Sequence, residues 1–206
     1  MLVNERLVAV ASREVSDSDR IAIVDAEPRL DVIRETADWV AIDKPAGMPT
    51  QPPHDRATRS AEELLRAKYR EIYLVHRIDT PTSGIVLFAR TRKAAADLSK
   101  LFATGEIKKT YLAIGAGELQ PMTIDTPIEG KEAVTIVRPR DGIVECEIKT
   151  GRTHQIRIHL ASIGHPILGD RRYGGPPAQR LMLHAWKLEH ASIGVVEAPI
   201  PINFAP

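Results

Sequence analysis

The chain has 206 residues, of which 43% are hydrophobic and 27% are charged, and its formal net charge is +1 at pH 7. These proportions are close to the averages of globular proteins and argue against a collagen-like or wholly disordered chain. No apolar run approaches the ~18–20 residues that a membrane-spanning helix needs, and the one cysteine, Cys146, has no partner for an internal disulfide, so we expect a cytoplasmic protein with one buried core and no membrane association.

Short apolar runs separated by loops characterise the first half of the chain, after polar and irregular residues at 1–25. Apolar runs of strand length predict strands, apolar residues three or four apart predict helices, and clusters of Pro and Gly predict loops. In chain order, the expected elements are a strand at Trp39–Ile42, a loop over 45–53, a helix at Arg59–Tyr69, an extended segment at Tyr73–Arg77, a turn at Ile78–Gly84 and a buried strand at Ile85–Ala89.

The second half contains more strands than helices. Thr91 is a suitable N-cap and Gly105 a suitable stop for a helix over Arg92–Thr104. The further elements are strands at Thr110–Ile114, Ala133–Val137 and Gly142–Lys149, a helix at His154–Ile163, a loop over 169–177 and a last strand at Leu181–Leu188. Alternation in the third of these strands predicts that Ile143, Glu145 and Glu147 face water. Because strands and helices do not alternate regularly, we expect an α+β fold with a central, mostly antiparallel sheet.

One cluster of polar residues has the setting of a reactive loop. The segment His76–Gly84 places Asp79 among hydroxyl side chains, on a glycine-terminated turn between two apolar runs. Loops held by rigid strands are where reactive side chains tend to be presented. The alternative, about equally favoured by composition, is that Asp79 only caps its turn.

A second cluster, Gly151–Leu160, has two arginines and two histidines in ten residues. On a helix, Thr153, Ile156, Arg157 and Leu160 would share one face. The spacing of the histidines is not that of a zinc-binding HExxH helix, and one cysteine is too few for a structural zinc site, so no metal is expected. The chain also lacks phosphate-loop, dinucleotide-binding and serine-hydrolase motifs.

Charge is segregated along the chain. Residues 76–111 hold seven Lys/Arg and three Asp/Glu, and residues 150–206 hold six and three, whereas the segments 1–75 and 112–149 each carry a net charge of −3. If the two basic stretches meet in space, they would form a patch for a polyanion. The alternative is an ordinary mixed surface.

The string HRIDTPTSGIVLFAR, residues 76–90, closely resembles the catalytic motif of RluA-type (RluA/RsuA-like) RNA pseudouridine synthases. Five further segments match in the family's order: Asp43–Gly47, Lys109–Ala113, Gly151–His159, Gly164–Asp170 and Leu181–Ala185. Ile78 replaces the Leu that is usual in the catalytic motif, which is a mild exchange. The resemblance implies a catalytic domain over 36–206, with a central mostly antiparallel sheet flanked by helices, and an N-terminal extension over 1–35 that is too short for the S4 RNA-binding domain often found in the family.

The resemblance also implies an activity: conversion of specific uridines to pseudouridine in structured RNA, either rRNA, tRNA or both, by a monomer without cofactor or metal. It makes Asp79 the essential carboxylate, which either attacks C1′ or takes a proton from C2′. Arg157 would keep that carboxylate charged, and Tyr111 would stack on the base unless it is merely a core tyrosine. We expect the three side chains to converge in a cleft.

The target uridine must leave its helix, so a residue has to fill the gap. The resemblance makes Arg77 the candidate, with phosphate binding or a structural ion pair as its alternative, and Ile156 packs either on the uracil or in the core. The full set implied to bind RNA is His76, Arg77, Lys109, Arg152, Thr153, His154, Gln155 and Ile156.

Two other functions compete with this one. A catalytically weak relative that only binds RNA would have lost Asp79, Tyr111 or Arg157, and all three are present. A nucleosidase or glycosidase would need a second carboxylate ~5–10 Å from the first, and the matching segments offer no evident one.

Overall fold

The computed structural model describes residues 30–53 and 58–204, together with residues 2–3, 6–7, 16 and 21–22. The irregular conformation expected for residues 1–25 therefore falls mostly outside the described residues. Three two-residue strands in that part, β1 (Leu2–Val3), β2 (Arg6–Leu7) and β3 (Ile21–Ala22), pair as a small antiparallel sheet.

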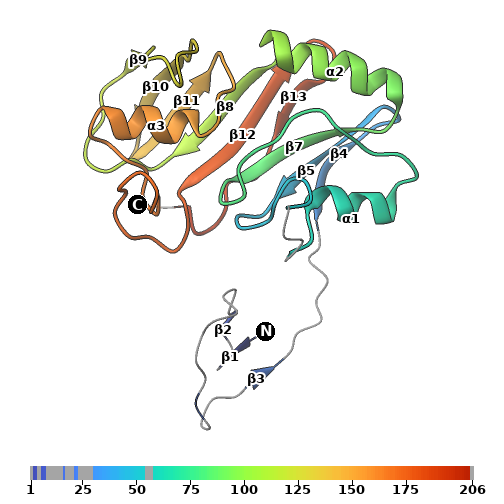
Figure 1. Ribbon diagram of the computed structural model, residues 1–206, viewed down its shortest axis with the longest axis horizontal. Coiled ribbons are helices and arrows are strands. Elements are labelled where there is room, and N and C mark those ends of the chain that lie inside the picture. Colours follow the sequence, from blue (N-terminus) through green and yellow to red (C-terminus); the bar gives the residue numbers. More distant parts are fainter. Residues whose placement is uncertain are drawn as a thin grey trace.

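A ten-stranded sheet organises the rest of the chain, with the order β4-β5-β7-β12-β8-β11-β10-β9 and with β6 and β13 added beside β7 and β12. Figure 1 shows it extending from β9 and β10 at one end to β4 and β5 at the other. The strands are β4 (Asp31–Glu35), β5 (Trp39–Lys44), β6 (Tyr73–Leu74), β7 (Ser83–Ala89), β8 (Lys108–Ala113), β9 (Met122–Ile124), β10 (Thr135–Arg140), β11 (Ile143–Ile148), β12 (Leu183–His190) and β13 (Gly194–Glu197). All these pairings are antiparallel except β7 with β12, so the predicted mostly antiparallel sheet is confirmed.

The described residues hold three helices, α1 (Ala61–Lys68), α2 (Arg92–Thr104) and α3 (Gln155–Ser162). Helix α1 begins later than predicted because Ser60 and Glu63 form a capping box at its start. Helix α2 has the predicted bounds, with Thr91 as N-cap and Gly105 in the left-handed conformation at its end. Helix α3 starts one residue late because His154 is itself left-handed, with φ 55°.

Each helix buries one face in its own apolar cluster against the sheet. Ala61 and Leu65 of α1, Ala94 and Leu98 of α2, and Ile156 and Leu160 of α3 belong to three separate clusters. Each helix therefore packs on a different part of the sheet. Together these contacts hold in place the loops that precede β7 and follow β11.

Three strand predictions need correction. Strand β12 is not the last, because β13 follows it, and strands β4 and β9 were not predicted. Their sequences explain the omissions: β4 and β13 are largely exposed edge strands without an apolar run, and β9 has only three residues. Glu147, expected to face water, has a side chain that is only 7% exposed, because Lys108, Arg138 and Lys149 surround it.

Candidate active site

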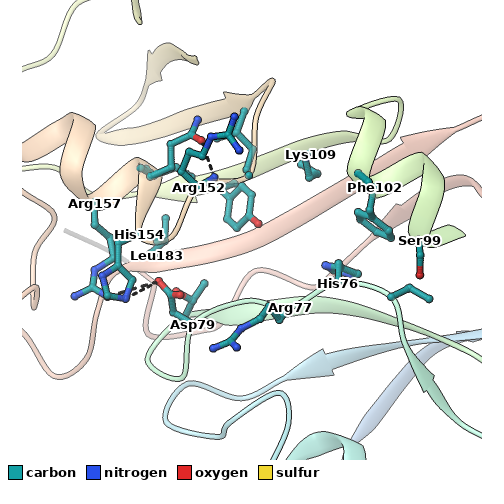
Figure 2. A pocket seen from close by; sticks show the side chains of 18 residues that line it. His76, Arg77, Asp79, Ser99, Phe102, Lys109, Arg152, His154, Arg157 and Leu183 are labelled. Carbon is teal, nitrogen blue, oxygen red and sulfur yellow. Dashed lines mark hydrogen bonds and ion pairs between the residues drawn. The ribbon is translucent and has the colours of Figure 1, made fainter. Parts of the chain in front are cut away.

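A cavity of about 360 Å³ lies between the loop that precedes β7 and the start of α3. This volume is within the range of small-molecule sites, roughly 300–1,000 Å³. Its walls come from residues 75–82, the second half of α2, strand β8, residues 148–157 and Leu183. Figure 2 shows Asp79, His154 and Arg157 toward one end and Phe102, Ser99 and Lys109 toward the other.

The loop that carries Asp79 is tied to the loop after β5. The Thr50 hydroxyl donates to the carbonyl of Ile78 at 2.8 Å. The Gly47 N–H donates to the carbonyl of Thr80, also at 2.8 Å. These bonds hold the residues on both sides of Asp79, so the position of its carboxylate is set by a second segment of chain.

Lys44 also connects the loop after β5 to the loop that carries Asp79, through hydrogen bonds made inside the protein. It is fully buried, and its ammonium donates to the carbonyls of Pro45, Met48 and Thr80 at 3.0, 2.6 and 3.2 Å. Burial lowers the pKa of Lys44 to about 7, although the charge of Asp79 opposes that shift. Lys44 was not predicted as a site residue, and its role is to hold the loop beneath the carboxylate.

Arg157 links Asp79 to a second, buried carboxylate. Its Nη1 lies 3.6 Å from Asp79 Oδ2, while its Nε and Nη2 donate to the two oxygens of Asp170 at 2.7 and 2.8 Å. Arg157 is 6% exposed and Asp170 1%. Burial alone would raise the pKa of Asp170, but the hydrogen bonds and charge of Arg157 outweigh it and hold that pKa below its usual value. The fork to Asp170 thus fixes the guanidinium that faces Asp79.

His154 is the third group near the carboxylate. Its Nε2 lies 3.6 Å from Asp79 Oδ2, and its Nδ1 shares a 2.9 Å hydrogen bond with the hydroxyl of Tyr173. Burial lowers the pKa of His154, again against the opposing effect of Asp79. A neutral His154 leaves Arg157 as the positive partner of Asp79, and the left-handed backbone of His154 is the kind of strain that clusters at active sites.

Tyr111 lines the cavity from β8, two residues after Lys109. Burial, with a further contribution from the charge of Asp79, raises the pKa of Tyr111. The phenol therefore stays protonated beside Asp79. The three residues predicted to converge, Asp79, Tyr111 and Arg157, do line one cavity.

Most of the predicted RNA-binding residues line this cavity too, but they differ in what they can offer. Gln155 is 3% exposed, and its amide is engaged by Val134, Thr135, Thr150 and Arg152, so it holds the loop together. Arg152 donates from Nε to the carbonyl of Glu132. Exposed Thr153 does not line the cavity.

His76 is held in a neutral form on the cavity wall. Its Nε2 accepts a 2.9 Å hydrogen bond from the Leu87 N–H, and its ring stacks on Phe102 with centroids 4.1 Å apart. Burial lowers the pKa of His76 to about 3. It therefore offers a ring face rather than a charge, whereas the neighbouring Arg77 is exposed at the mouth of the cavity.

Four contributors to the site were not predicted: Lys44, Asp170, Tyr173 and Phe102. Lys44 and Asp170 lie in segments that resemble the family's, so their charge in otherwise apolar or glycine-rich strings was an available signal. Tyr173 is in a glycine-rich loop and Phe102 on the apolar face of a helix, and neither context distinguishes a site residue from a structural one.

The residues that line the cavity bear on the nucleosidase or glycosidase alternative, which needs a second carboxylate. Within the described part of the chain, Asp79 is the one carboxylate that lines the cavity. The described residues contain no cluster of His, Cys, Asp and Glu that could hold a metal ion. No helix in that part is long and apolar enough to cross a membrane.

Comparison with known proteins gives a consistent answer. The family model for RNA pseudouridylate synthase matches residues 38–162. An uncharacterised RNA pseudouridine synthase of Bacillus subtilis, YhcT, is 34% identical over 98% of this chain and 80% of its own. The dual-specificity RNA pseudouridine synthase RluA of Haemophilus influenzae is 32% identical over 79% of this chain and 87% of its own.

Two further relatives extend the comparison. Ribosomal large subunit pseudouridine synthase D of Nitrosomonas europaea is 31% identical over 92% of this chain and 67% of its own. The solved structure of human RNA pseudouridylate synthase domain containing 1 superposes with a TM-score of 0.73 and 26% identity, covering 87% of this chain and 88% of that one. The chain therefore belongs to the RluA-type RNA pseudouridine synthases, which are isomerases.

Proposed function

We propose that residues 36–206 form the catalytic domain, which isomerises specific uridines in rRNA or tRNA with Asp79 as the reacting carboxylate. The observation that carries the proposal is the position of Asp79 in the cavity, 3.6 Å from the buried guanidinium of Arg157 and in the same lining as Tyr111. A carboxylate that lines a cavity beside a guanidinium and an aromatic ring suits attack on a sugar carbon or removal of a sugar proton.

The reaction exchanges one glycosidic bond for another. The N1–C1′ bond of the uridine breaks, the uracil turns within the cavity, and a C5–C1′ bond forms; C5 then loses its proton and N1 gains one. Asp79 either bonds to C1′ while the uracil is detached or takes the C2′ proton and later returns it. No oxidant, metal or cofactor enters this balance.

Arg157 and Tyr111 have separate parts in this proposal. Arg157, held by Asp170, faces the Asp79 carboxylate and orients it. Tyr111 provides an aromatic face for the detached uracil, and its hydroxyl can relay the C5 proton, releasing its own proton to solvent as it accepts the one from C5. Ile156, 4% exposed on the cavity wall, closes the apolar side of that space.

Arg77 is the residue we assign to uridine extrusion. It is exposed at the cavity mouth, two residues before Asp79, where a guanidinium can stack in the place of the extruded base and bond phosphates. Arg77→Ala should therefore reduce activity on structured RNA more than activity on an unpaired oligonucleotide. Equal losses on the two substrates would contradict this role.

The names of the relatives suggest where to look for the substrate: ribosomal RNA for one of them, and more than one RNA for the dual-specificity one. The test is release of tritium from 5-[³H]uridine in transcripts of rRNA and tRNA, because C5 loses its hydrogen only in the isomerisation. Mapping of pseudouridines in total RNA from a deletion strain would then locate the sites. No release from either transcript, together with an unchanged pseudouridine map, would contradict the proposal.

A further inference from the structure

The cavity has a second end, away from the residues that surround Asp79 (Figure 2). Its far end is lined by Lys109 of β8 and by Phe102 and Ser99 of α2, with His76 below Phe102. In Figure 2 these residues lie on the side of the cavity away from His154 and Arg157. The isomerisation as proposed above uses none of their functional groups.

The side chain of Lys109 is largely buried and its ammonium is unpaired within the described part of the chain, which suits the binding of an anion. It is 7% exposed, and its ammonium has no hydrogen-bond or ion-pair partner among the residues that the structure describes. That ammonium borders Gly151, where even a methyl group in place of the glycine hydrogen would lie 3.9 Å from it. Burial lowers the pKa of Lys109, which reflects the same lack of a partner. An ammonium without a partner, on a side chain that is largely buried, has already lost part of its hydration, so pairing with an anionic ligand is favoured.

The next residue provides the contrast. Lys108 points to the opposite face of β8, is 46% exposed, and pairs with Glu189 at 3.3 Å and with Glu147 at 4.0 Å. Lys109 and Tyr111 share the cavity face, and two residues along a strand are ~6.6 Å apart. An anion at Lys109 would therefore lie next to, and not on, a base stacked on Tyr111.

The aromatic pair completes this end of the cavity. Phe102 and His76 stack with ring planes 19° apart, and the hydrogen bond from the Leu87 N–H fixes the imidazole. Rings that line a cavity beside an unpaired cation are the combination that binds single-stranded nucleic acid, because bases stack on the rings and phosphates pair with the cation.

We propose that Lys109 and the Phe102–His76 pair form a second subsite, which binds the phosphate and the base of one unpaired nucleotide adjacent to the target uridine. The proposal rests on the function proposed above, because it takes the target uridine to occupy the Asp79 end. It predicts that the enzyme binds a flanking nucleotide by stacking its base on the Phe102–His76 pair and pairing its phosphate with Lys109.

The phosphate contact can be tested by binding alone. In an Asp79→Asn background, we would measure the fluorescence anisotropy of a labelled five-nucleotide single-stranded RNA with a central uridine, at several salt concentrations. Lys109→Met should weaken binding about tenfold and reduce the slope of log affinity against log salt by about 1. The matched control Lys108→Met should stay within about threefold of the parent with its slope unchanged.

The base contact needs a second comparison. Removing the base of one flanking nucleotide, which leaves its phosphate, should weaken binding about tenfold in the parent and hardly at all in Phe102→Leu. Leucine keeps the apolar packing of α2 but removes the ring. The subsite is wrong if Lys109→Met and Lys108→Met lose equal affinity, or if Phe102→Leu keeps the full penalty for the missing base.

The outcome is separable from that of the proposed function. If the wild-type protein releases no tritium while Lys109→Met still weakens binding as described, the isomerisation is contradicted and the nucleotide subsite stands. If tritium is released but the binding results fail, only the subsite is lost. Melting of the free protein checks folding: Lys109→Met should not lower the melting temperature, because the Lys109 ammonium makes no hydrogen bond or ion pair with the described residues that the exchange could break.

Discussion

Asp79, Arg157 and Asp170 form a row of alternating charges, in which Asp79 and Arg157 line the cavity and Asp170 is buried behind them. Arg157 gives two of its nitrogens to Asp170 and turns the third toward Asp79. The arrangement explains how a guanidinium can be nearly buried and still face the carboxylate that we propose as the reacting group. It also makes Asp170 a positioning residue, which acts on the site through Arg157.

The buried pair predicts a specific instability. Asp170→Asn keeps the size of the side chain but leaves the Arg157 guanidinium without its buried countercharge, so the free energy of unfolding should fall by about 2–4 kcal/mol. Urea denaturation would measure it. Arg66→Ala, which breaks the exposed ion pair with Glu62, is the control and should cost less than about 1 kcal/mol. Similar losses of unfolding free energy in both variants would show that the buried Arg157–Asp170 pair contributes no more to stability than an exposed ion pair.

Sequence reasoning located the residues that line the cavity better than the residues that support them. Asp79 and Arg157 were identified through the resemblance of their segments to the family's motifs, since composition alone left turn capping equally favoured for Asp79. Phe102 does not stand out, because its apolar spacing on α2 is satisfied equally by core packing and by a cavity wall. Gln155 was expected to bind RNA and does line the cavity, but its amide is already hydrogen-bonded to the surrounding backbone, which the sequence does not reveal.

At the scale of elements, the join between β7 and β12 is the most constrained part of the sheet. Residues Ser83 and Gly84 pair with His184 and Ala185 in the one parallel ladder of the large sheet. Gly84 has φ 110°, and a Cβ there would lie 2.1 Å from the carbonyl oxygen of Ala185. The start of β7, four residues after Asp79, therefore depends on the absence of a side chain.

Substitution at this join should be severe. Gly84→Ala forces the two strands apart in addition to straining the backbone, so we expect a loss of more than about 3 kcal/mol in unfolding free energy, or failure to fold. Gly130→Ala is the matched control, because Gly130 also has positive φ, 72°, but nothing lies within 4 Å of its added Cβ. The control should lose only about 1–2 kcal/mol in the same denaturation experiment. Equal losses would mean that the close approach of β12 is unimportant.

The edge formed by β4 and β5 predicts a pH dependence. Burial raises the pKa of Asp43 to about 6, and the charge of Asp31, its cross-strand neighbour, adds to the shift, while Arg180 and Lys44 oppose it. Between pH ~4 and ~6 the folded state therefore binds more protons at Asp43 than the unfolded state does. The contribution of Asp43 to stability thus falls as the pH rises through this window, and the penalty is fully present above pH ~6.

Asp43→Asn should remove that penalty. Because Asp43 is only partly buried, we expect a gain of about 1–2 kcal/mol in unfolding free energy at pH 7, shrinking toward zero at pH 4. Urea denaturation of both proteins at the two pH values measures it. A variant less stable than the parent at pH 7, or a gain that is independent of pH, would contradict the account.

The whole molecule brings together the two basic stretches that the sequence keeps apart. With the exceptions of Val75 and Ile148, every residue that lines the cavity belongs to residues 76–111 or 150–206. Charge alone left this meeting as one of two alternatives, since charge along a chain does not determine where segments pack, and the family resemblance favoured it. The predicted helices and central strands were placed well because capping and apolar runs are local signals, whereas the edge strands β4 and β13 depend on neighbours far away in the chain.

Exchange of Asp79 tests the central claim most directly, because it separates chemistry from binding. Asp79→Asn keeps the size of the side chain and removes its charge and nucleophile. We predict that tritium release from 5-[³H]uridine RNA is abolished, while RNA affinity stays within about tenfold of wild type, or roughly 1.4 kcal/mol, and falls steeply with salt in both proteins. Tritium release at the wild-type rate by Asp79→Asn would contradict the assignment of Asp79 as the reacting carboxylate.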